Sequence, residues 1–89
     1  MTTCALASFV ASNGGMVTVH GRTFTVVDIR SVRDIGWSAT FQSKRAQYTA
    51  MQTVPPRLPQ APEYERWFVL LGARALHFAV KHDDLRDLR

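Results

Sequence analysis

The stretch MVTVHGRTFTVV, Met16 to Val27, predicts a tight β-hairpin. If His20 and Gly21 are the central residues of a two-residue turn, Val19 lies opposite Arg22 and Val17 lies opposite Phe24. One face of the hairpin then carries four apolar side chains, Val17, Val19, Phe24 and Val26. The other face carries Met16 and threonines, which suit a solvated sheet surface. Because the whole stretch agrees with one register, it is the starting point for the fold.

A second hairpin is predicted downstream. WSATFQ (37–42) and AQYTAM (46–51) both alternate apolar and polar side chains, and an even-length loop through Ser43 to Arg45 places both apolar sets on the same face. At residues 27–29 apolar side chains fall on both faces, which indicates a bulge or a strand covered on both sides. Residues 15–53 are therefore predicted to form a four-stranded antiparallel meander.

Helices are predicted on either side of this meander. Residues 1–13 have apolar positions at helical spacing followed by an Asn-Gly stop, which predicts a short N-terminal helix. Residues 54–62 contain all four prolines and are expected to form an extended connector. Residues 63–89 carry an apolar stripe at helical period, so a C-terminal helix packed on one face of the sheet is expected. The alternative for residues 63–80 is a hairpin that turns at Gly72. The predicted fold is α+β, a single domain spanning 1–89.

The charge of the chain is unevenly distributed. The 89 residues carry a net charge of +4, and all of it lies in residues 1–62, where six basic side chains face two acidic ones. Residues 63–89 are neutral overall. Such an asymmetric field attracts an anionic partner, either nucleic acid or an acidic protein surface.

No catalytic or metal-binding motif is present in the sequence. The single cysteine, Cys4, forbids an internal disulfide and indicates a reducing compartment, so a cytoplasmic location is expected. His77 and His82 are five residues apart, which is the wrong spacing for two metal ligands on one face of a helix. No apolar run approaches the roughly 20 residues needed to cross a bilayer. We therefore expect a protein that is not an enzyme and has no metal, cofactor or membrane span.

The preferred function is a small basic binding module, with nucleic acid slightly favoured as the partner. Five cationic residues are expected on one continuous face: Arg22, Arg30, Arg33, Lys44 and Arg45. Trp37, Phe41 and Tyr48 could serve as a stacking platform for bases, although the same alternation is typical of a core. The candidate partner-binding residues are Arg22, Arg30, Arg33, Lys44, Arg45 and Arg57.

A second interpretation is a protein–protein interaction or inhibitor module, of the kind that phages and plasmids use to block a host complex. Aromatic residues and arginine on an exposed helix are natural anchors for such an interface. Surplus apolar area on that helix would also favour a homodimer. The candidate residues for this surface are Tyr64, Arg66, Trp67, Arg74 and Phe78.

Overall fold

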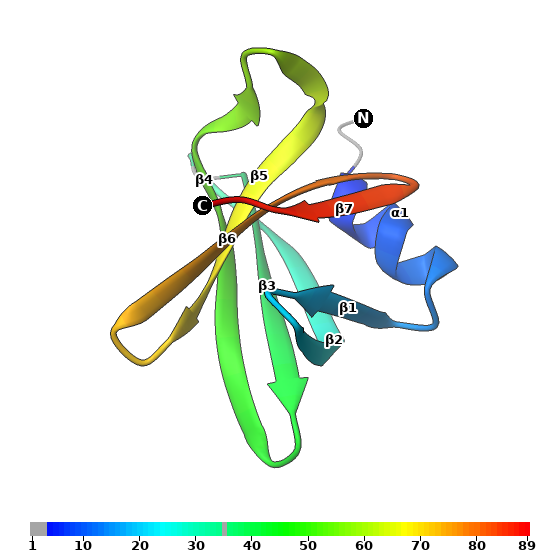
Figure 1. Cartoon of the computed structure of the whole chain (residues 1–89), viewed down its shortest axis with the longest axis vertical. Helices are drawn as coiled ribbons and strands as arrows, with labels where there is room; N and C mark the ends of the chain where they lie inside the picture. The colour runs from blue at the N-terminus through cyan, green and yellow to red at the C-terminus, as the bar shows by residue number, and fades with distance from the viewer. Residues whose placement is uncertain (1–3, 35) are drawn as a thin grey trace.

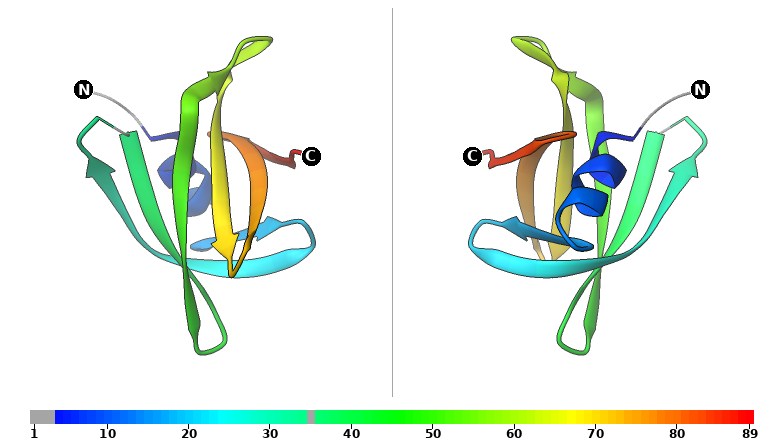
Figure 2. Two further views of the ribbon diagram at one scale, coloured as in Figure 1. Left: turned by 90° about the vertical axis from the view of Figure 1, so that its left-hand side faces the viewer. Right: turned by 90° about the vertical axis from the view of Figure 1, so that its right-hand side faces the viewer.

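The computed structural model describes residues 4–34 and 36–89, and this part of the chain is mostly β-structure (Figure 1). Seven strands pair antiparallel in chain order, and the sheet curls into a nearly closed barrel with one short helix beside it (Figure 2). The prediction of an α+β fold with a four-stranded meander and two helices is therefore wrong. The elements are α1 (Ala5–Ser12), β1 (Met16–Val19), β2 (Arg22–Val32), β3 (Gly36–Ser43), β4 (Ala46–Leu58), β5 (Ala61–Leu71), β6 (Arg74–Lys81) and β7 (Asp84–Asp87).

The first hairpin has the predicted register. Val19 pairs with Arg22 and Val17 with Phe24, as the sequence indicated. His20 and Gly21 both have positive φ angles, +50° and +77°, as a primed turn requires because its twist matches that of the flanking strands. On the solvent face the hydroxyl groups of Thr18 and Thr23 lie 3.0 Å apart.

The second hairpin, β3 and β4, is also confirmed. Phe41 pairs with Tyr48 across a two-residue turn at Lys44 and Arg45, so the two apolar sets share a face. The ambiguous stretch at residues 27–29 contains a β-bulge, because the pairing of β2 with β3 shifts between Val26 and Asp28. Val27 is the additional residue, and its side chain is 47% exposed.

The proline-rich segment does not leave the sheet as a separate connector. Strand β4 continues to Leu58, and β5 begins at Ala61. Pairing between these strands is interrupted from Gln52 to Arg57, where Pro55 and Pro56 have no amide hydrogen to donate to a ladder. The prolines therefore produce an irregularity within the β4–β5 hairpin, and the Val54–Pro55 peptide bond is cis.

Residues 63–89 form β5, β6 and β7, so the predicted C-terminal helix is wrong and the hairpin alternative is right. Alternate residues of β5 (Glu65, Trp67 and Val69) are at most 1% exposed, which is the period of a strand. Tyr64 and Phe68 on the other face supplied the extra apolar positions that imitated a helical stripe. Gly72, with φ of +61°, lies in the two-residue turn between β5 and β6.

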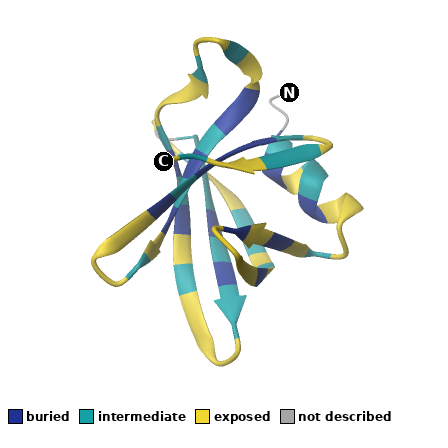
Figure 3. Cartoon of the chain, viewed as in Figure 1, coloured by how far each residue is buried: buried dark blue, intermediate teal, exposed yellow. Residues whose placement is uncertain are grey.

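The core fills the inside of the barrel. Four large aromatic side chains, Phe24, Phe41, Trp67 and Phe78, are at most 2% exposed. Neighbouring rings lie 5.5–6.4 Å apart, from Phe24 through Phe41 and Phe78 to Trp67. Figure 3 shows buried positions alternating with less buried ones along the strands, while the turns are exposed. Each ring in this row buries roughly 150–250 Å², so the four make a large contribution to a core that also contains aliphatic residues.

Helix α1 confirms the predicted N-terminal helix and packs against β5 and β6. Leu6 and Val10 join the barrel core. The N-cap residue Cys4 makes no side-chain capping hydrogen bond. Instead the buried carboxylate of Glu65 accepts the amides of Ala5 (2.8 Å) and Leu6 (3.2 Å). A residue of β5 thus satisfies donors that the start of any helix leaves unpaired.

The seam of the barrel lies between the two edge strands, β1 and β7. The turn between β1 and β2 bridges it, because the amide of His20 donates to the carboxylate of Asp87 at 2.9 Å. The imidazole Nε2 of His20 lies 2.9 Å from the backbone oxygen of His77 in β6. Side chains thus complete the closure across a gap that no backbone ladder spans in the described chain.

Candidate functional site

Three turns form a basic end of the barrel. In an antiparallel meander every second turn lies at the same end of the sheet, so the β1–β2, β3–β4 and β5–β6 turns share one end. In Figure 1 the β3–β4 turn lies at the bottom, the β5–β6 turn at the lower left and the β1–β2 turn nearer the middle. Their cationic residues are all exposed, and among the described residues none of them forms an ion pair within 4.0 Å. We call this set the basic end: Arg22, Lys44, Arg45 and Arg74.

The segments that build the basic end contain no acidic residue. They are HGR (20–22), SKRA (43–46) and GAR (72–74). Asp87 reaches the first of them, where its carboxylate is occupied by the amide of His20. Four positive charges on exposed turns therefore face solvent without a neighbouring countercharge in the same turns, which concentrates the positive potential there.

The remaining predicted cationic residues lie elsewhere. Arg33 is exposed beside Asp34 in the turn between β2 and β3, at the opposite end of the meander. Arg57 lies in β4 near the same end, and its guanidinium donates to the carbonyl of Pro62 at 3.1 Å. Arg30 is paired with Asp28 at 2.7 Å. The structure therefore brings together Arg22, Lys44 and Arg45, adds Arg74, and places the other three apart from them.

The aromatic residues considered for base stacking belong to the core. Phe41 is fully buried, and its ring packs between those of Phe24 and Phe78. Trp37 and Tyr48 are half-buried and packed against the same core. Of the two interpretations of this alternation, the core is the one that the structure shows. Phe41 is consequently not exposed for stacking beside the basic end.

The residues predicted for the alternative protein interface do not form one surface, because successive side chains of a strand point to opposite faces of the sheet. Trp67 and Phe78 are fully buried inside the barrel. Tyr64 and Arg66 point to the outer face of β5, where Tyr64 is buried at 4% exposure and Arg66 is half-buried, whereas Arg74 belongs to the basic end. No helix presents these five residues together, because residues 63–89 are strands.

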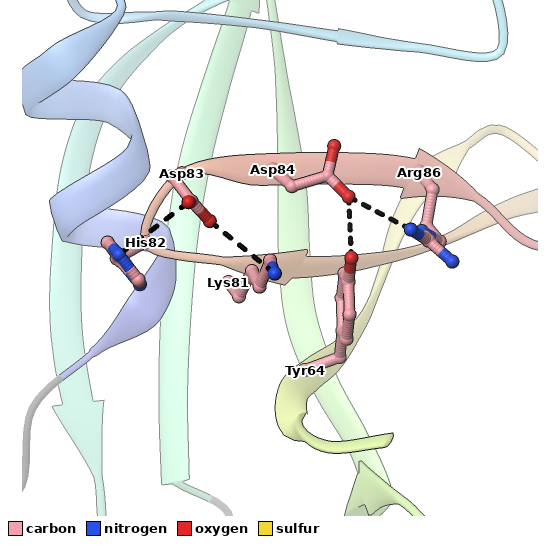
Figure 4. Close-up of polar contacts among 6 residues, drawn as sticks. All are labelled: Tyr64, Lys81, His82, Asp83, Asp84 and Arg86. Atoms are coloured by element: carbon pink, nitrogen blue, oxygen red, sulfur yellow. Dashed lines mark hydrogen bonds and ion pairs between the residues drawn. The ribbon is translucent and has the colours of Figure 1, made fainter. Parts of the chain in front are cut away.

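A polar cluster around Tyr64 was not foreseen from the sequence (Figure 4). The Tyr64 hydroxyl donates to the carboxylate of Asp84 at 2.5 Å, and Arg86 donates to the same oxygen at 3.2 Å. The Arg86 guanidinium and the Lys81 ammonium lie 4.7 and 5.3 Å from the centre of the Tyr64 ring. Asp83, in the adjacent turn, lies 3.7 Å from Lys81. Two cations and two carboxylates thus balance around one aromatic ring.

These contacts shift two pKa values in opposite directions. The hydrogen bond to Asp84 raises the pKa of Tyr64 above its usual value, because the phenol must keep its proton to donate. The same bond, helped by Arg86, lowers the pKa of Asp84. The cluster could have been predicted only if residues 64–89 had been predicted as strands, because its side chains come from β5, β6 and β7 lying side by side.

The chemistry-bearing residues outside this cluster are dispersed. Cys4 is buried, and burial raises the pKa of its thiol to about 11. Within residues 4–34 and 36–89, no three His, Cys, Asp or Glu side chains are grouped so as to hold a metal ion. His77 lies in β6 with its ring 5.6 Å from that of Phe68, and His82 lies in the following turn. The described part of the chain also contains no helix that is long and apolar enough to span a membrane.

Surface hollows lie along the seam and at the end opposite the basic end. A hollow of about 460 Å³ runs between α1, β1 and β7 and is lined by Phe9, Met16 and Leu85. A second, of about 470 Å³, adjoins the turn between β2 and β3, beside Trp37 and Val54. The sequence matches no protein-family model, and neither a curated protein nor a solved structure gives a significant match to this chain.

Proposed function

We propose that the protein is a non-enzymatic module that binds nucleic acid through its basic end. The observation that carries the proposal is the set of four exposed cations on three turns at one end of the barrel, without ion pairs among the described residues. The turns at the opposite end differ, because they contain acidic residues beside the basic ones: Asp34 follows Arg33, and Asp83 follows His82.

Contacts with phosphate rather than base edges would supply the affinity. Exposed arginine and lysine side chains neutralise phosphates and release counterions from nucleic acid. Phe41, which could have stacked on a base, is buried in the core. Base recognition therefore contributes little in this proposal, and binding depends weakly on sequence.

Salt dependence of binding tests this mechanism. Four phosphate contacts predict that the logarithm of the association constant falls with the logarithm of salt concentration, with a slope of about −3.6 for duplex DNA. Fluorescence anisotropy with labelled oligonucleotides of unrelated sequence should then show an affinity loss of roughly 100-fold between 50 and 200 mM salt. An association constant that does not change with salt would contradict phosphate binding and would favour a protein partner.

Two charge reversals separate a localised site from a general attraction. Arg45→Glu alters the basic end, whereas Arg33→Glu makes the same charge change in an exposed turn at the opposite end. We expect Arg45→Glu to weaken binding and to reduce the salt slope by about one, with Arg33→Glu close to wild type. Equal losses in the two variants would show that net charge alone attracts the nucleic acid.

An acidic protein surface is the alternative partner. A second copy of this chain, forming a homodimer, is a further alternative. Both are tested by passing host lysate, with and without nuclease, over the immobilised protein and by sedimentation of the free protein. We place this activity in the cytoplasm, because the chain has a single thiol, Cys4, and that thiol is buried.

A further inference from the structure

A hollow between the end of β4, the strands β5 and β6, and the two residues after β7 combines charged and apolar side chains. It measures about 270 Å³ and is bounded by Leu58, Arg66, His77, Leu88 and Arg89. Two arginines and a histidine are thus combined with two leucines. No carboxylate side chain is among the lining residues. The hollow is separate from the basic end, because none of Arg22, Lys44, Arg45 and Arg74 is among its lining residues.

Arg66 is the anchor of this hollow. It follows buried Glu65 and precedes buried Trp67, so its side chain leaves β5 on the opposite, outer face. Its Nε is fully buried and has no hydrogen-bond partner within the described chain. A buried N–H of a charged group without an acceptor is unfavourable, so an acceptor that reaches this guanidinium gains more than one at an exposed arginine.

The carboxylates on the nearby strand β7 are already engaged. Asp84 accepts hydrogen bonds from Tyr64 and Arg86. Asp87 accepts the amide of His20 across the seam. Neither Arg66 nor Arg89 forms an ion pair within 4.0 Å among the described residues. Among the described residues, the two arginines of the hollow are therefore not ion-paired with any carboxylate.

We propose that this hollow binds a small carboxylate that carries a short apolar chain. The planar guanidinium of Arg66 matches a carboxylate with two parallel hydrogen bonds, and Arg89 adds a second positive charge. Leu58 and Leu88 provide the apolar walls for the chain. The hollow, at about 270 Å³, has room for a small ligand the size of hexanoate.

Titration of the ¹⁵N-labelled protein with hexanoate tests the assignment. We expect a saturable shift of the Arg66 Nε–Hε resonance, with the arginines of the basic end unaffected. The neutral probe 1-hexanol should leave this resonance in place, and inorganic phosphate should bind more weakly because it cannot occupy the apolar walls. Phosphate that binds as tightly as hexanoate would overturn the assignment of a carboxylate with an apolar chain, as would equal shifts of all arginines.

Variants test the two halves of the ligand separately. Arg66→Gln should weaken hexanoate binding at least tenfold, and the exposed Arg89→Gln should weaken it without touching the packed part of β5. Leu88→Ala should weaken hexanoate while leaving phosphate unchanged, and Arg33→Gln is the charge-matched control. Unchanged hexanoate affinity in both arginine variants would overturn the proposal. Oligonucleotide binding should be the same in wild type and Arg89→Gln, so this site can fail independently of the basic end.

Discussion

The carboxylate of Glu65 accepts the indole N–H of Trp67 at 3.0 Å while it also holds the first amides of α1. Both side chains are at most 1% exposed, so one buried negative charge satisfies three donors inside the barrel. A carboxylate in such a place is stable only because its oxygens are hydrogen-bonded and lie at the positive end of a helix. The pair joins the N-terminal helix to the centre of the sheet.

Removing this carboxylate should destabilise the fold strongly. Glu65→Ala leaves the Trp67 indole and two helix amides without their acceptor, and we expect a loss of about 2–4 kcal/mol in the free energy of unfolding. Urea denaturation followed by tryptophan fluorescence measures it. Glu63→Ala, at an exposed position two residues earlier, is the control and should change stability by less than about 0.5 kcal/mol. Similar losses in both variants would contradict the capping role.

Gly36 should tolerate a side chain less well than Gly72. Both have positive φ angles, +111° and +61°, but a methyl group at Gly36 would collide with the side-chain oxygen of Gln52, whereas the space around Gly72 is open. That oxygen accepts the amide of Trp37 at 2.8 Å, so it cannot move without breaking a bond. We expect Gly72→Ala to cost about 1 kcal/mol and Gly36→Ala about 2–4 kcal/mol. Thermal unfolding of the two variants compares them, and equal costs would rule out the collision.

The bond between Tyr64 and Asp84 should give stability a dependence on pH at both extremes. Because the pKa of Asp84 is lowered on folding, its contribution is present above the ordinary carboxyl range and is lost as pH falls through the folded value. Because the pKa of Tyr64 is raised, its contribution is present below the ordinary phenol range and is lost as pH rises through the folded value. Urea midpoints measured across pH should therefore vary less in Tyr64→Phe than in wild type. Superimposable profiles would show that the bond does not form in solution.

The thiol of Cys4 should be nearly inert in the folded protein. Burial raises its pKa from 9.0 to about 11, and the neighbouring charge of Glu65 acts in the same direction. At pH 8 the thiolate fraction falls about 100-fold, and the rate of alkylation by iodoacetamide falls with it. Reaction in 8 M urea provides the unfolded reference. A folded rate within a factor of five of that reference would contradict the burial of this side chain.

The sequence predicted the structure correctly where the turn residues and the alternation of side chains pointed to the same register. In the first hairpin, the turn residues and the alternation of side chains both required the register that Val19 and Arg22 adopt. In β5 they disagreed. Tyr64 and Phe68 lie on the outer face, so the stretch from Tyr64 to Leu71 satisfied a helical period as well as a strand period. The choice between helix and strand was decided by the pairing of β5 with β4 and β6, which cannot be recognised from the sequence of β5 alone.

The basic end could be foreseen only in part. Lys44 and Arg45 were recognisable as the tip of a hairpin, and Arg22 followed a recognisable turn. Arg74 lies at the same end because the β5–β6 turn returns there. This placement could be predicted only from the number of strands between the β3–β4 turn and the β5–β6 turn. Arg33 was grouped with them on charge alone, although the single strand β2 lies between it and the β1–β2 turn and therefore places it at the other end of the meander.

The strand order of the barrel follows the order of the chain, and this has a kinetic consequence. Each ladder closes a short loop, so successive hairpins can zip together quickly. Among the side-chain hydrogen bonds of the described chain, those that join residues more than 50 positions apart are the bonds of Glu65 to α1 and of His20 to Asp87 and His77. We therefore expect the ribbon of hairpins to assemble first and to roll up late, when its first and last strands find each other.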